Sequence, residues 1–65
     1  MNGYEEFRRL MYEHNVRIAD VVRGTGVTRM TILNWKKGGN TSMKTFRRIA
    51  SYFDVPVETF IKEKE

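Results

Sequence analysis

The side chains best suited to chemistry in this sequence are cations in the middle of the chain. Residues 17–48 contain eight Lys and Arg residues but a single acidic residue, Asp20. The segments on either side are weakly acidic, and the whole chain carries a net charge of +4. A concentrated basic stretch is the electrostatic pattern of a surface that contacts nucleic-acid phosphates. The alternative, from charge alone, is a solvated basic helix face.

Catalytic and metal-binding chemistry has no comparable support in the sequence. There is no cysteine and only one histidine, His14. We find no nucleophile–base pair, no metal-ligand spacing and no glycine-rich phosphate loop. The sequence therefore predicts no enzyme, no metal and no cofactor, with His14 in a capping or surface role at a helix end. Because no run is apolar enough for a signal peptide or a membrane span, we expect a cytoplasmic protein without membrane contact.

Short helices must position these cations. Apolar residues recur at helical spacing in five segments that are separated by residues typical of turns, and no strand pattern or internal repeat is present. The pattern predicts an all-α fold of five helices in a single domain, residues 1–65.

Capping residues predict where these helices begin and end. Asn2, with a glutamate three residues later, predicts a capping box at the start of the first helix, and Asn15 fits its end. Thr28 and Ser42 are the predicted N-caps of the third and fourth helices. Pro56 fits the first turn of a last helix.

The third helix, roughly Thr28 to Lys37, is predicted to have two unlike faces. With successive side chains 100° apart, Ile32 and Trp35 share one face, so both are predicted to be core residues. The opposite face carries Met30, Leu33, Asn34 and Lys37, flanked by Arg29.

The fourth helix has an inward stripe and a basic side. The predicted stripe is Met43, Phe46, Ile49, Ala50 and Phe53. Arg47 and Arg48 lie off this stripe and are predicted to form a solvated face.

The segment from Arg17 to Lys37 combines a short helix, a turn and a capped helix. Gly26 lies where the two helices must meet within a few residues, in a turn that often needs a positive φ. Val27 is predicted to plug the turn into the core. This arrangement would project the third helix outward, as entry into a DNA groove ~12 Å wide requires.

Two runs of the sequence resemble a known family. Residues 21–38 (VVRGTGVTRMTILNWKKG) resemble the helix-turn-helix of the Cro/lambda-repressor-like (Xre) family, and residues 46–60 (FRRIASYFDVPVETF) resemble its fourth and fifth helices. The likeness covers roughly residues 5–61. It implies a compact five-helix fold in which helices 2 and 3 form the helix-turn-helix. It also implies operator binding on double-stranded DNA, usually as a homodimer, by a transcriptional regulator such as a bacterial or phage repressor.

The resemblance also implies which residues touch DNA. The positions that meet base edges correspond to Arg29, Met30, Thr31 and Asn34. Arg29 suits guanine O6 and N7, and Asn34 suits adenine N6 and N7. With the cations added, the predicted phosphate contacts are Arg17, Thr28, Lys36, Lys37, Asn40, Thr41 and Lys44.

The sequence departs from the family at three places. Ile18 stands where a glutamine is common, so one phosphate contact is absent or moved. Val22 replaces a usual alanine at the contact between helices 2 and 3. Met11 and Lys36 replace an arginine–glutamate pair, which leaves Lys36 free to add to the positive face.

Two questions stay open at this point. The resemblance implies a dimer contact from Val57, Phe60 and Ile61, whereas these residues can instead close the core of one molecule. The main alternative function is an antitoxin or another protein-interaction module of the same fold, which would use Met30, Leu33 and the face of the last helix. No small-molecule effector is evident.

Overall fold

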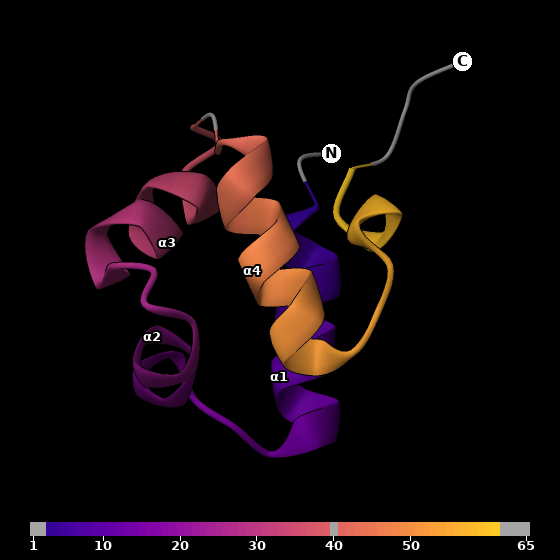
Figure 1. The fold of residues 1–65 in the computed structure, drawn as a ribbon. Helices are drawn as coiled ribbons and strands as arrows, with labels where there is room; N and C mark the ends of the chain where they lie inside the picture. The colour runs from indigo at the N-terminus through magenta and orange to yellow at the C-terminus, as the bar shows by residue number, and fades with distance from the viewer. Residues whose placement is uncertain (1–2, 40, 62–65) are drawn as a thin grey trace.

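The computed structural model describes residues 3–39 and 41–61 of the chain. In those ranges it has α1 (Tyr4–His14), α2 (Ile18–Thr25), α3 (Arg29–Lys36), α4 (Met43–Phe53) and a 3₁₀ turn, η1 (Val57–Thr59). These ranges contain no strand, so the predicted all-α class is confirmed. Figure 1 shows α2 and α3 together on one side of α4 and η1 on the other. None of these helices is long and apolar enough to cross a membrane.

Most helix ends lie where the capping residues predict them. Thr28 and Ser42 each accept a hydrogen bond from the backbone N–H three residues later, at 3.2 Å in both cases. Asn15 ends α1 with φ 57°, and Gly26 ends α2 with φ 80°. These local signals are reliable because each satisfies backbone groups that the helix itself leaves unpaired.

The start of α1 differs from the prediction. Asn2, the predicted N-cap, lies outside the described residues, and the N-cap residue is Gly3, with φ 84° and no side-chain cap. A Cβ atom at Gly3 would collide with the backbone carbonyl oxygen of Phe60. A close approach between the two ends of the domain therefore requires glycine here.

An aromatic cluster around Trp35 forms the centre of the core. The Trp35 side chain is 1% exposed. Its ring centroid lies 5.4 Å from Tyr4, 5.1 Å from Phe7, 5.2 Å from Phe46 and 5.7 Å from Phe60. Several of these contacts are edge-to-face, which aromatic rings favour. Residues of α1 and α4, together with Phe60 after η1, therefore pack against the inner face of α3. The core role predicted for Trp35 is confirmed.

The prediction of a fifth α-helix after Pro56 is wrong. Pro56 precedes a 3₁₀ turn, Val57–Thr59, in place of an α-helix. The backbone N–H groups of Thr59, Phe60 and Ile61 each donate to the carbonyl three residues earlier. This bonding pattern is that of a 3₁₀ turn, the tighter helical form that proteins use in short pieces.

Burial of Phe60 corrects part of the predicted dimer contact. Its ring is 1% exposed and stacks on Phe46, with centroids 6.2 Å apart and planes at 16°. Phe60 therefore closes the core of one molecule and is not available to a second copy. Val57 and Ile61 are half-buried.

Met43 is the one residue of the predicted α4 stripe that does not point inward. It is 47% exposed, whereas Ile49, Ala50 and Phe53 are buried. Met43 is the first residue of α4, and a helical side chain covers the turn on the N-terminal side of its own Cα. Its side chain therefore extends past the edge of the core.

Candidate DNA-binding surface

The turn between α2 and α3 holds the two helices at a fixed angle. The N–H of Gly26 donates to the carbonyl of Val22 at 2.9 Å, which closes α2. Val27 follows and is 6% exposed, so it fastens the turn to the core as predicted. Ile32, on the inner face of α3, is fully buried. The helix-turn-helix is thus anchored from behind, and the outer face of α3 is left to solvent.

That outer face carries most of the predicted base-reading residues. Arg29 and Asn34 are exposed, and Met30 is 74% exposed. Leu33 lies between them and is 37% exposed. The outer face of this short helix therefore presents a cation, an amide and apolar side chains to solvent.

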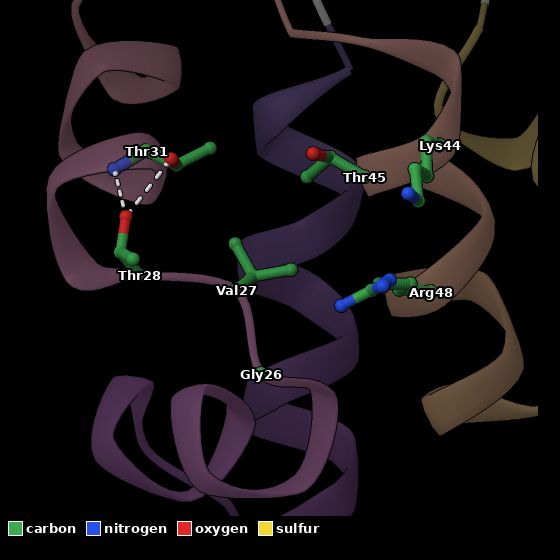
Figure 2. Close-up of a pocket in the computed structure, with 7 residues that line it drawn as sticks. All are labelled: Gly26, Val27, Thr28, Thr31, Lys44, Thr45 and Arg48. Atoms are coloured by element: carbon green, nitrogen blue, oxygen red, sulfur yellow. Dashed lines mark hydrogen bonds between the residues drawn. The ribbon is translucent and has the colours of Figure 1, made fainter.

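Thr31 lies differently from the other predicted base contacts. Its side chain is half-buried, and its hydroxyl lies 3.0 Å from the hydroxyl of Thr28. Figure 2 shows both threonines beside the turn. Thr31 therefore belongs to the flank of α3 that faces α4.

Asn34 is supported by the loop that follows α3. The N–H of Gly39 donates to the Asn34 carbonyl at 2.9 Å. A Cβ atom at Gly39 would lie 2.6 Å from Nδ2 and 2.8 Å from Cγ of Asn34. The carboxamide therefore packs on bare backbone, which limits the directions that it can take.

Within the described residues, no carboxylate pairs with the cations of α3 and α4. In the described ranges the ion pairs join Arg9 to Glu6 and Glu13, and Arg23 to Asp20, so all of them lie in α1 and α2. Hydrogen bonds to Glu6 and to Glu13 raise the pKa of Arg9. The exposed cations that make no ion pair within residues 3–39 and 41–61 include Arg29, Lys36, Lys37, Lys44 and Arg47.

The start of α2 engages the acidic residue nearest to Arg17. The Asp20 carboxylate accepts a hydrogen bond from the backbone N–H of Arg17 at 2.9 Å and one from the Arg23 guanidinium at 2.9 Å. The one acidic residue of the basic stretch is therefore occupied within α2. The exposed Arg17 guanidinium has no such partner in the part of the chain that the structure describes.

The loop after α3 contains further predicted phosphate contacts. Lys37 is the C-cap of α3 and is exposed. Thr41 is half-buried, and its hydroxyl has no hydrogen-bond partner among the described residues. Asn40 lies outside the described residues.

Arg48 is a further candidate for the DNA-binding surface, although the sequence predicts that it lies on a solvated face. Its Nη1 donates to the Thr25 carbonyl at 3.4 Å, so the side chain reaches across to the turn. It also lines a groove with Lys44, Thr28 and Thr31. Its position four residues after Lys44 places both cations on one side of α4, a spacing that is visible in the sequence.

Comparison with known proteins agrees with this geometry. The family description of Cro/C1-type HTH DNA-binding domains matches residues 6–63. The chain belongs to this family, and it is a DNA-binding domain of the helix-turn-helix class. The family is not enzymatic, in agreement with the prediction. Searches among curated proteins and among solved structures found no match.

Proposed function

We propose that this protein is a sequence-specific regulator of transcription that inserts α3 into the major groove of double-stranded DNA. One observation carries the proposal: the exposed face of α3 is backed by buried Ile32 and Trp35. It is flanked by cations that have no carboxylate partner within residues 3–39 and 41–61. Uncompensated cations at this density repel one another, and a polyanion relieves that repulsion.

The side chains divide into two roles. Arg29 and Asn34 read bases, the first by two hydrogen bonds to guanine and the second by two to adenine, while Met30 contacts a thymine methyl group. Thr31 borders this reading face. The residues that contact phosphates, and so add affinity without sequence specificity, are Arg17, Thr28, Lys36, Lys37, Asn40, Thr41 and Lys44.

The regulator acts as a homodimer with two-fold symmetry. Two copies would place their α3 helices one DNA turn apart, about 34 Å, on a palindromic operator. Half-buried Val57 and Ile61 at the C-terminal segment are the residues that we assign to this contact.

A second candidate function is favoured by the apolar part of the α3 face. Met30 and Leu33 are exposed beside each other along the helix, and such side chains also serve protein-interaction surfaces. In that case the chain would hold a protein partner, as an antitoxin does, and a bound partner would mask Met30 and Leu33.

Selection of bound sites from random duplexes tests the proposal. We expect one palindromic motif, with an affinity that falls steeply as salt rises because several phosphates are contacted. Binding without sequence preference, or binding that salt does not weaken, contradicts it. A protein partner that competes with duplex for Met30 and Leu33 would favour the second candidate.

A further inference from the structure

Outside the reading face, the described residues form one groove with a consistent chemical character. It lies between the α2–α3 turn and α4 and has a volume of about 270 Å³. Its lining residues are Gly26, Val27, Thr28, Thr31, Lys44, Thr45 and Arg48. We call this feature the turn groove.

The turn groove is lined for an anion. Figure 2 shows the threonine hydroxyls of α3 on one side and two cations of α4 on the other, with Val27 between them. No carboxylate is among its lining residues. Lys44 and Arg48 are four residues apart on one helix, where like charges destabilise each other unless an anion joins them. The volume is several times the ~30 Å³ share of one water molecule, so a hydrated phosphate fits.

Arg48 is held loosely enough to bind such an anion. Its hydrogen bond to the Thr25 carbonyl is 3.4 Å long, at the long end for an N–H···O bond, which is usually 2.7–3.2 Å. The guanidinium is exposed and makes no ion pair in the described ranges. An oxyanion would be a stronger partner than this carbonyl, because charge-assisted hydrogen bonds are shorter and stronger than neutral ones.

The position of the turn groove relative to α3 indicates where that anion comes from. Thr31 lies only about 60° around the helix from Asn34, since successive residues are 100° apart. A helix inside a major groove has a sugar-phosphate backbone on each side. The turn groove is lined by Thr31 of α3 and by residues of α4, so it lies on the flank of α3 along which one of those backbones would run.

We infer that the turn groove seats one backbone phosphate of the bound duplex, and that Arg48 is a phosphate-binding residue together with Lys44 and the Thr28–Thr31 hydroxyl pair. This inference rests on the proposed DNA binding. It gives Arg48 a role that its neighbour Arg47 does not share.

The test compares Arg48→Ala with the matched control Arg47→Ala on the selected duplex. Both variants lose one exposed cation from the same helix, so a general loss of charge affects them alike. We expect Arg48→Ala to bind about tenfold more weakly and to lower the slope of log K against log salt by about one, with Arg48→Lys keeping most of the affinity. Arg47→Ala should change the slope by much less. Thermal melting of each variant separates weakened binding from weakened folding.

A single uncharged methylphosphonate, moved along each strand in turn, locates the contact. Wild type should lose affinity when one phosphate on the α4 side of the site is replaced. Arg48→Ala should lose clearly less at that phosphate, because only Lys44 and the threonine hydroxyls still contact it. Equal behaviour of the Arg48→Ala and Arg47→Ala variants overturns the turn-groove inference alone, whereas wild type that binds no duplex overturns the proposed function with it. Tight binding of inorganic phosphate that displaces Arg48 from Thr25 yet leaves duplex binding intact also overturns the inference, because the site would then serve a free anion.

Discussion

The Asn34 carboxamide lies directly against Gly39, at a distance that leaves no room for a Cβ atom on the loop residue. Gly39 also donates its N–H to the Asn34 carbonyl. The side chain that we assign to adenine is therefore oriented by the loop after α3 as well as by α3 itself. A base-reading residue gains from such support, because a fixed amide loses less entropy when it binds.

Gly39→Ala tests this support. The new methyl group would overlap Asn34, so we expect the preference at one base position to weaken while the general affinity for duplex is largely kept. Gly38→Ala is the matched control: its φ of 95° is strained for alanine, but nothing lies within 4 Å of the added Cβ. We expect this control to lose about 1–2 kcal/mol of stability and to keep its base preference. Identical preferences for the two variants would contradict the role of Gly39.

Two substitutions should separate base recognition from phosphate contact: Arg29→Ala and Lys37→Ala. Loss of the Arg29 guanidinium should remove about 1–3 kcal/mol of binding free energy at one guanine position and relax the base preference there. Loss of Lys37 should weaken binding to all duplexes about equally and lower the salt slope by about one. Competition assays with single-base variants of the selected site measure both effects. The division is wrong if the two substitutions produce the same pattern.

The packing of α2 on α4 gives a stability prediction. A Cβ atom at Gly24 would collide with the Tyr52 ring, including Cδ1 at 2.8 Å. We expect Gly24→Ala to destabilise the domain by about 1–3 kcal/mol, as overpacking usually does, despite the better helix propensity of alanine. Adding Tyr52→Ala should remove the overlap, so the two changes should be strongly non-additive in denaturant melts. Simple additivity would show that the ring moves aside freely.

The anchoring of α3 predicts opposite results for its two faces. Trp35→Ala removes the centre of the aromatic cluster and should cost about 3–5 kcal/mol, most of the stability of a domain of this size. Met30→Ala, on the exposed face, should change stability by less than about 0.5 kcal/mol. Circular dichroism melts measure both. A folded Trp35→Ala variant with near-normal stability would contradict the packing described above.

The C-terminal segment allows self-association and folding to be tested separately. We expect Val57→Ser and Ile61→Ser to weaken the dimer and leave a folded monomer, because both residues are only half-buried. Phe60→Ala should unfold the domain, since its ring is buried against Trp35. Sedimentation equilibrium gives the oligomeric state of each variant. Unchanged association of the Val57 and Ile61 variants would place the contact elsewhere.

The features that sequence could predict are those with local causes. Thr28, Ser42, Asn15 and Gly26 bond within a few residues of themselves, so their roles can be inferred from residue type and spacing. The inner face of α3 was equally accessible to prediction, because helical periodicity alone places Ile32 with Trp35.

The features that sequence reasoning missed depend on contacts between distant segments. Gly3 is the N-cap of α1, and the backbone of Phe60, nearly a full chain length away in sequence, leaves no room there for a Cβ atom. Phe60 fills a space beside Trp35 that no local pattern reveals. Arg48 reaches the α2–α3 turn only once α4 has packed, although its spacing from Lys44 is a signal that could have placed the two together.

Methylation interference on the selected duplex tests the central claim most directly, because dimethyl sulfate modifies guanine N7 in the major groove and adenine N3 in the minor groove. If α3 enters the major groove, methylation at guanine N7 should exclude DNA from the bound fraction at specific positions of each half-site, and one of these effects should disappear in Arg29→Ala. Interference confined to adenine N3, with guanine N7 methylation tolerated at every position, would contradict the insertion of α3.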